Sequence, residues 1–144
     1  MRRGLTLAEL ILTCTFIGLV AGVAVPRVGD ALDGIRITQA GHEVAGALTI
    51  GRAVAIRRAD YARVIVDEAQ GSIRVEAGTD TLLHRALREL HRVALKASMD
   101  TITYAPSGMG YGVSNSTIVV SLKQRAETVT VSRLGRMRTT LGQQ

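Results

Sequence analysis

Aromatic and sulfur-containing side chains are scarce in this sequence of 144 residues. It contains no Trp, one Phe, three Tyr and one Cys. The single cysteine, Cys14, excludes a disulfide within the chain. Because aromatic rings are so few, Val, Ile, Leu and Ala must fill any core. Roughly 118 residues follow the apolar N-terminal run, which is enough for one modest domain.

Catalytic and metal-binding constellations are also missing from the sequence. Its histidines are His42, His84 and His91, and no Cys or paired carboxylate completes a metal set beside them. The glycine-rich residues 108–112 lack the Lys-Ser/Thr of a phosphate-binding loop. We therefore expect surface histidines, a flexible loop, and a protein that is not an enzyme and needs no metal or cofactor.

One long apolar run is present at residues 5–25, and it contains one charge, Glu9. As a helix it would be about 31 Å long, which matches the hydrocarbon core of a bilayer. Arg2 and Arg3 precede the run, so we expect a cytoplasmic N-terminus and an exported remainder. An unpaired carboxylate in lipid costs about 3 kcal/mol or more. Glu9 should therefore have a partner.

Three interpretations account for this N-terminus. A cleavable secretory signal would explain the basic start and the small residues 21–24, but the run is long for such a signal and includes Glu9. A plain signal anchor leaves Glu9 equally unexplained. The third interpretation rests on the sequence GLTLAEL at residues 4–10. This sequence resembles the class III leader of type IV pilins and type II secretion pseudopilins.

The resemblance implies processing and assembly. A prepilin peptidase would cut after Gly4 and methylate Leu5, which replaces the family's usual Phe. Glu9 would become the fifth mature residue, and its partner would be the N-terminal amine of a neighbouring subunit in a helical bundle. Pro26 would kink the helix where it leaves the membrane.

The same resemblance divides the chain into three parts. Residues 1–4 would be the leader, residues 5–26 a transmembrane and assembly helix, and residues 27–144 a periplasmic globular domain. The protein would then be a single-pass protein of the bacterial inner membrane, and its partners would include the prepilin peptidase and other pilins or pseudopilins.

Residues 28–58 contain no Pro and predict an amphipathic continuation of the helix. Small and apolar residues recur at spacings of three and four: Ile37, Gly41, Val44, Leu48, Gly51 and Ala55. Gly41, Gly46 and Gly51 lower the helix propensity, but they would allow a sheet to approach closely. With an exit at Asp60-Tyr61, the pattern predicts one helix of roughly fifty residues.

Alternating patterns predict a hairpin directly after the helix. Its strands would be residues 62–67 and 72–77, joined by a turn at residues 68–71. Residues 82–97 match a helix better than a strand, and an extended loop is the alternative.

The remaining chain predicts three more strands. One is short, at residues 101–104. The other two, at residues 117–122 and 128–133, would form a second hairpin, with Val129 and Val131 facing inward.

Four segments of the globular part are similar to the GspH/FimT group of minor pseudopilins and minor type IV pilins. They are residues 51–58, 63–66, 102–108 and 129–136, which read GRAVAIRR, RVIV, ITYAPSG and VTVSRLGR. This similarity implies an α+β, pilin-like fold, in which a long N-terminal helix packs on antiparallel sheets. It also implies a minor subunit near the tip of a pseudopilus.

The C-terminal residues 122–144 are strongly basic, with five Lys or Arg against one acid. The sequence GRMR at residues 135–138 resembles the pattern with which some FimT-type pilins bind DNA. Arg133, Arg136 and Arg138 are therefore candidate contacts for DNA phosphates or for a partner protein. We expect no aromatic residue near enough to stack on a base, which weakens the case for single-strand binding.

We expect a minor pseudopilin of a type II secretion system, a structural subunit that supports protein export. The alternative is a FimT-like minor pilin that binds DNA for natural transformation.

Overall fold

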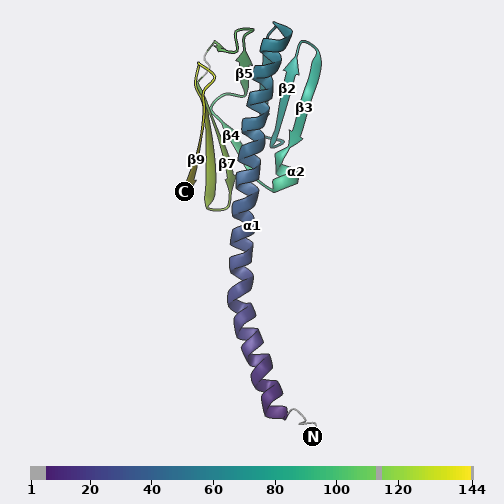
Figure 1. Ribbon diagram of the computed structural model, residues 1–144, viewed down its shortest axis with the longest axis vertical. Helices are drawn as coiled ribbons and strands as arrows, with labels where there is room; N and C mark the ends of the chain where they lie inside the picture. The colour runs from purple at the N-terminus through teal and green to yellow at the C-terminus, as the bar shows by residue number, and fades with distance from the viewer. Residues whose placement is uncertain (1–5, 113–114, 144) are drawn as a thin grey trace. The chain divides into compact units, whose positions relative to one another are not determined.

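The computed structural model describes residues 6–112 and 115–143 (Figure 1). The chain divides into two compact units, Met1–Gly34 and Ile35–Gln144. We call the second unit the head. The helix α1 (Leu7–Arg58) belongs to both units and has 52 residues, which confirms the prediction of one helix of about fifty residues that ends before Asp60.

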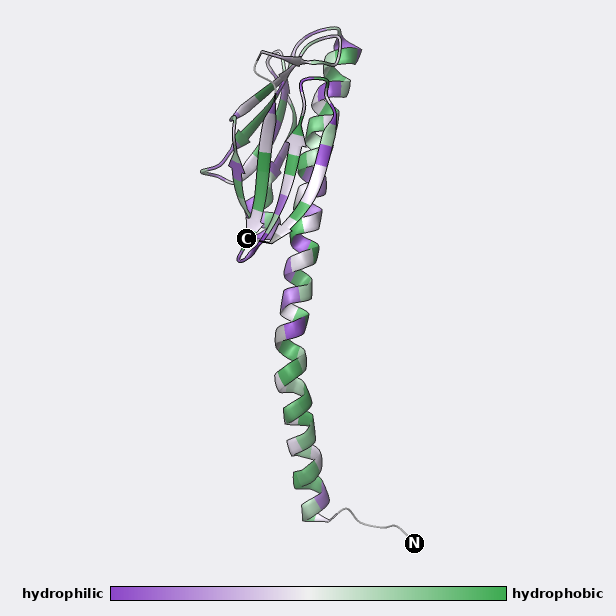
Figure 2. Cartoon of the chain, turned by 90° about the vertical axis from the view of Figure 1, so that its left-hand side faces the viewer, coloured by the Kyte–Doolittle hydropathy of each residue, from purple (hydrophilic) through white to green (hydrophobic). Residues whose placement is uncertain are grey.

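In the first unit, α1 is apolar and long enough to cross a membrane. The side chains of residues 7–25 are exposed throughout, and Figure 2 shows that the colouring of this part of the helix is mostly apolar. A water-soluble helix would bury an apolar surface of this extent, and none of the described residues covers this one.

In the head, the described strands form two antiparallel sheets. The first has the order β3-β2-β1-β5-β6 and the second the order β4-β7-β8-β9. The strand bounds are β1 (Ala62–Asp67), β2 (Ser72–Ala77), β3 (Asp80–Ala86), β4 (Ala94–Ala97), β5 (Thr101–Tyr104), β6 (Gly110–Tyr111), β7 (Ser116–Leu122), β8 (Arg125–Val131) and β9 (Met137–Gln143). A short helix, α2 (Leu87–His91), lies between β3 and β4.

One core joins both sheets to the part of α1 that lies in the head. All six positions of the stripe expected from residue 37 to residue 55 are buried, as predicted. Of the three glycines for which a close approach of the sheet was expected, two make it. A Cβ at Gly51 would lie 2.5 Å from Val64 Cγ2, and one at Gly41 would lie 2.5 Å from the carboxyl carbon of Glu127, whereas Gly46 has no such neighbour.

The first hairpin and the short strand at residues 101–104 have the predicted bounds. The helix expected at residues 82–97 is wrong, because this segment is β3, the five-residue α2 and β4. The residues that suggested a helix do not share a face: Leu87 is buried, while Leu90 and Ala94 are exposed.

The second hairpin is present with a tighter turn than expected, since β8 starts at Arg125 and Leu122 pairs with that residue. Val129 and Val131 are buried, as predicted. β9 was missed altogether. It pairs with β8 along its length, and its described side chains are exposed, so it lacks the alternation by which buried strands are recognised.

Candidate functional site

The N-terminal end of α1 is closed by a capping box between Thr6 and Glu9. The backbone N–H and the hydroxyl of Thr6 both donate to Glu9 Oε2, each at 2.9 Å, and the Glu9 N–H donates to Thr6 Oγ1 at 3.3 Å. Such boxes occupy backbone donors that a helix start leaves free. The Thr-x-x-Glu spacing was readable in the sequence and was missed. Glu9 therefore has a partner within its own chain.

The other N-terminal predictions remain predictions. Gly4 and Leu5, the expected cleavage and methylation positions, lie outside the described residues. The helical assignment of α1 runs through Pro26 without a break, and the kink expected there is still to be tested.

Arg133, Arg136 and Arg138 lie around the connection between β8 and β9. Arg133 follows the end of β8, Arg136 immediately precedes β9, and Arg138 pairs with Thr130 in the sheet. All three residues are exposed. The three predicted arginines therefore lie at one end of the second sheet, Arg133 and Arg136 in the connection and Arg138 in β9.

Backbone hydrogen bonds hold this connection in a tight turn. The N–H of Gly135 donates to Ser132 O at 2.8 Å, and the N–H of Ser132 donates to Arg136 O at 2.9 Å. The N–H of Arg136 also donates to Ser132 Oγ, at 3.2 Å. Gly135 has a φ of 73°, in the left-handed region that favours glycine.

A second turn lies against the first. It is closed by the N–H of Gly108, which donates to Ala105 O at 2.8 Å. The N–H of Gly110 then donates to Arg133 O at 2.9 Å, which links the two turns. We call residues 105–110 and 132–136 together the paired turns.

Arg52, on α1, lies between the paired turns. A Cβ at Gly108 or at Gly135 would each lie 3.2 Å from Arg52 Nε, so the guanidinium fills the space that a side chain would need. Arg52 Nε is buried and has no hydrogen-bond partner among the described residues. Burial raises the pKa of Tyr104, and the charge of Arg52 opposes that rise. Sequence inspection did not identify Arg52, because its role depends on two glycines more than fifty positions away.

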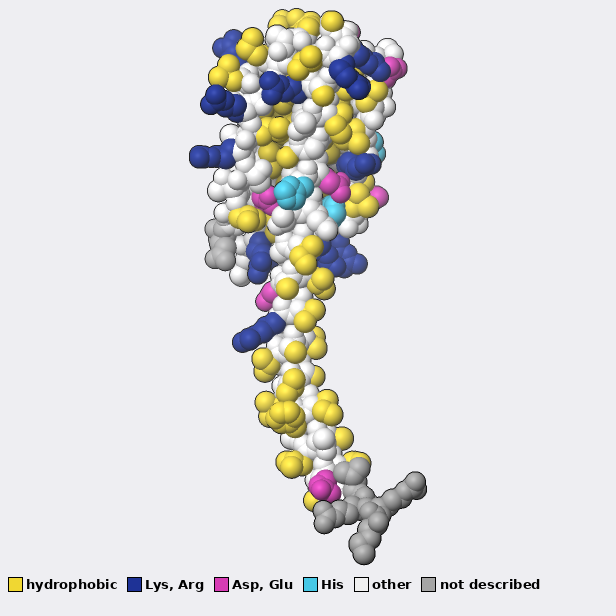
Figure 3. Space-filling model, viewed as in Figure 1, with side chains coloured by type: hydrophobic (Ala, Val, Ile, Leu, Met, Phe, Trp, Pro, Cys, Tyr) yellow, Lys and Arg dark blue, Asp and Glu magenta, His cyan; other side chains and the backbone are white. Residues whose placement is uncertain are grey.

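Some arginines elsewhere in the head have acidic partners that the arginines around the paired turns lack. Ion pairs form between Arg58 and Asp80 at 2.9 Å and between Arg63 and Glu76 at 3.6 Å. Among the described ion pairs, none involves Arg52, Arg133, Arg136 or Arg138. Figure 3 shows basic side chains spread over the visible face of the head with few acidic ones between them. Uncompensated guanidinium groups of this kind attract anionic partners.

Exposed aromatic rings adjoin the paired turns. The centroids of Tyr61 and Tyr111 are 5.0 Å apart at an interplanar angle of 71°, and the residues are 46% and 61% exposed. Tyr111 directly follows Gly110, whose N–H is bonded to Arg133. The expectation that no aromatic residue lies near the basic C-terminus was therefore wrong, because β6 carries Tyr111 to it from another part of the chain.

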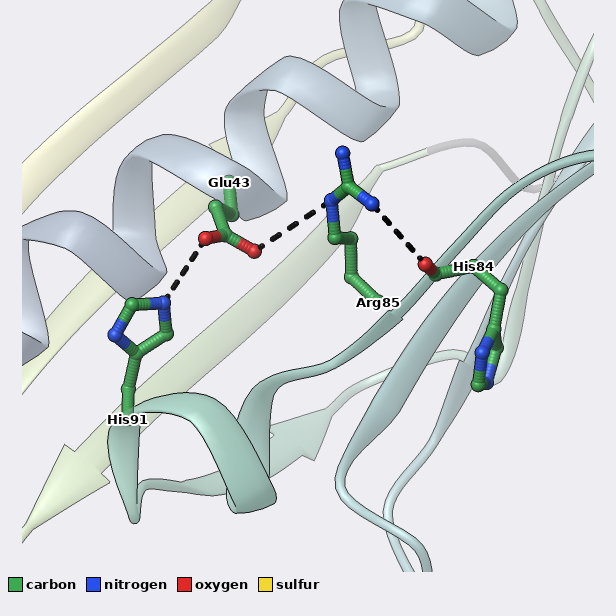
Figure 4. Close-up of polar contacts among 4 residues, drawn as sticks. All are labelled: Glu43, His84, Arg85 and His91. Atoms are coloured by element: carbon green, nitrogen blue, oxygen red, sulfur yellow. Dashed lines mark hydrogen bonds and ion pairs between the residues drawn. The ribbon is translucent and has the colours of Figure 1, made fainter.

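Surface positions were predicted for all three histidines, and His91 departs from this. Its Nε2–H donates to Glu43 Oε1 at 2.9 Å, and its side chain is 12% exposed (Figure 4). Arg85 Nε lies 4.0 Å from the other Glu43 oxygen. These two contacts join α2 and β3 to α1. His84 and His91 do not share a helix, and no group of potential metal ligands occurs in the described part of the chain.

Known structures with this arrangement of helix and sheets were found. The type IV minor pilin FimU of Pseudomonas aeruginosa superimposes with a TM-score of 0.60 at 12% identity, over 72% of this chain and 91% of FimU. The fold is that of a minor pilin or pseudopilin. The minor pseudopilin EpsH, from the Type 2 Secretion System of Vibrio cholerae, gives a TM-score of 0.59 at 13% identity, over 74% of this chain and 97% of EpsH. No family model and no curated protein sequence matches the chain.

Proposed function

We propose that the protein is a minor pseudopilin, a structural subunit at or near the tip of a type II secretion pseudopilus. The exposed apolar surface of α1 at residues 7–25, joined to a head of pilin-like fold, is the observation that supports this role. Such a surface has two successive uses. It first holds the precursor in the inner membrane, and it then packs against other subunits in the filament.

Assembly would follow cleavage after Gly4 by a prepilin peptidase and methylation of Leu5. The head would then be periplasmic, and Glu9 would meet the new N-terminal amine of a neighbouring subunit. The capping box supports a specific form of this step. Because Thr6 already holds the carboxylate in place, Glu9 reaches its neighbour in a fixed orientation, and less conformational entropy is lost on docking.

Mass spectrometry of the membrane-extracted protein tests the processing. A mature chain that begins with N-methylated Leu5 is expected, whereas a chain that begins near Val25 would restore the ordinary secretory signal. For assembly, Glu9→Ala should insert into the membrane at the wild-type level but enter filaments poorly. Thr49→Ala, on the exposed side of α1 in the head, is the matched control. Normal incorporation of Glu9→Ala would contradict the pairing.

A second candidate function is DNA binding by a minor type IV pilin during transformation. The exposure of Arg133, Arg136 and Arg138, and the lack of described ion pairs for them, favour it. Phosphate contacts by guanidinium groups would give affinity without reading sequence, and the affinity would fall steeply with salt. A gel shift at low salt with the wild type and with Arg136→Ala/Arg138→Ala tests it. Absence of a shift with the wild-type protein would rule it out.

A further inference from the structure

We propose that the surface formed by Tyr61, Tyr111, Arg133 and Arg136 binds single-stranded nucleic acid. The arginines would contact phosphates and the tyrosines would stack on bases. The proposal rests on the second candidate function, since it uses the same arginines, and it specifies the ligand. We call these four residues the tyrosine–arginine surface.

The aromatic half of this surface comes from two places in the chain. Tyr61 follows the end of α1, and Tyr111 is the last residue of β6, which pairs with Tyr104 and Thr103 of β5. The interplanar angle of 71° means that one ring presents its edge to the face of the other. The edge-on ring keeps both faces free of its partner, and the other ring keeps one. Two tyrosines that are about half exposed thus offer flat apolar area to a ligand.

A backbone hydrogen bond places the turn that carries the arginines beside the strand that carries Tyr111. Gly110 N–H is bonded to Arg133 O at 2.9 Å, and the Cα of Tyr111 is about 3.8 Å from that of Gly110. Arg136 belongs to the same turn as Arg133. Asp60 adjoins Tyr61 in the sequence, and its Oδ1 accepts the N–H of Tyr61 at 2.7 Å, so one acid stands beside two arginines. The surface therefore retains an excess of positive charge.

Arg52 makes this surface rigid. Its guanidinium lies against both Gly108 and Gly135, so it packs between the two turns that carry this surface. Because its Nε is already buried, its contribution is to position the turn that carries Arg133 and Arg136. A surface that is fixed before binding loses less conformational entropy when a ligand arrives.

The aromatic rings distinguish single strands from duplexes. In a duplex the bases are stacked inside the helix, and a protein reaches chiefly the phosphates and the groove edges. In a single strand the base faces are accessible, and stacking on an aromatic side chain strengthens binding about tenfold or more per base. Arginines alone would bind both forms, whereas arginines with exposed tyrosines should prefer the single strand.

Fluorescence anisotropy with the full-length protein in detergent tests the proposal. The probes are a labelled twenty-nucleotide DNA strand of mixed sequence and the duplex made from it, at low salt. We expect tighter binding of the single strand. Tyr61→Ala/Tyr111→Ala should weaken single-strand binding about tenfold or more, with duplex binding unchanged. Tyr61→Phe/Tyr111→Phe keeps the rings and should bind like the wild type. Leu90→Ala, which removes an exposed side chain from α2, is the control for loss of apolar surface.

The outcomes separate the two proposals. Equal affinity for both probes, or wild-type binding by the double alanine variant, overturns the tyrosine–arginine surface and leaves DNA binding by the arginines intact. Weak binding by the double phenylalanine variant also overturns it, because stacking does not need the hydroxyls. Binding of neither probe by the wild type overturns both proposals. Weaker binding of both probes by Arg136→Ala, with a greater loss for the double alanine variant on the single strand alone, supports both.

Discussion

The two halves of α1 contain similar proportions of apolar residues but place them differently. In the first unit they surround the helix and are exposed, whereas in the head most of them form a buried stripe from Ile37 to Ala55 and a few, such as Ile50 and Ile56, stay exposed. The difference shows that the two halves are stabilised by different partners. The head supplies sheets that cover its part of the helix, whereas the apolar first part has no such cover among the described residues. Substitutions that alter only one half should therefore change only one property.

The largest difference should come from leucines in the two halves. Leu48 is fully buried in the core, and its replacement by alanine should lower the free energy of unfolding of the head by about 3 kcal/mol. Leu12 is 72% exposed, and Leu12→Ala should leave unfolding of the head unchanged while reducing incorporation into filaments. Chemical denaturation of the full-length proteins in detergent measures the first effect. An equal loss of stability in both variants would show that the halves are not independent.

The next largest difference in stability is expected between substitutions of two glycines in the head part of α1. A Cβ at Gly51 would lie 2.5 Å from Val64 Cγ2, and nothing lies within 4 Å of one at Gly46. Gly51→Ala should therefore destabilise the head by about 1–2 kcal/mol through overpacking. Gly46→Ala should stabilise it by up to about 1 kcal/mol, because alanine has the higher helix propensity. Thermal unfolding measures both, and the pair is a matched control for propensity. Stabilisation by both variants would mean that β1 can move away from the helix.

The sequence predicted α1 and the strands β1, β2, β5, β7 and β8, which have one buried face and one more exposed face. The apolar stripe from Ile37 to Ala55 and the apolar–polar alternation around Val64 both result from burial of one face. β9 has no such apolar–polar pattern, since the described part of it is exposed on both faces. Residues 82–97 misled for the opposite reason. The leucines there are spaced as in a helix, but they belong to a strand, a short helix and another strand that follow one another.

The residues of the candidate sites were likewise predicted only where a pattern in the sequence indicates them. Glu9 and the C-terminal arginines were found because local motifs carry them. Arg52 and Tyr111 were not found, because each matters through a contact with a distant part of the chain. Motifs are local in sequence, while a surface assembled by strand pairing is not.

The pH dependence of the head should be governed in part by Glu127, which is buried against α1. Its Oε2 has no hydrogen-bond partner among the described residues. Burial raises the pKa of this carboxyl above its ordinary value of 4.5, and the nearby His42 partly opposes the rise. Below pH 4.5 the group is protonated in both states. As the pH rises through the raised pKa, the folded state must release a proton at a cost, so the free energy of unfolding falls.

Glu127→Gln should remove that dependence. We expect the variant to be more stable than the wild type by about 1 kcal/mol at pH 7, and the difference to shrink as the pH falls toward 4.5. Denaturation curves at several pH values measure it, and the comparison cancels the contributions of other carboxylates. A difference that stays constant with pH would mean that Glu127 remains ionised in the fold.

The smallest effect should be confined to the first unit. Thr6→Ala removes the hydroxyl that caps α1 and should cost about 1 kcal/mol at that helix end. Thr6→Ser keeps the hydroxyl and should resemble the wild type. Hydrogen exchange of the amides of residues 7–10 in detergent should quicken in the alanine variant alone, and the unfolding of the head should not change, because no part of its core involves Thr6. If Glu9 docks on a neighbour in the orientation that Thr6 imposes, filament incorporation should fall with Thr6→Ala and recover with Thr6→Ser. Faster exchange with normal incorporation would instead assign the capping box to the stability of the helix end alone.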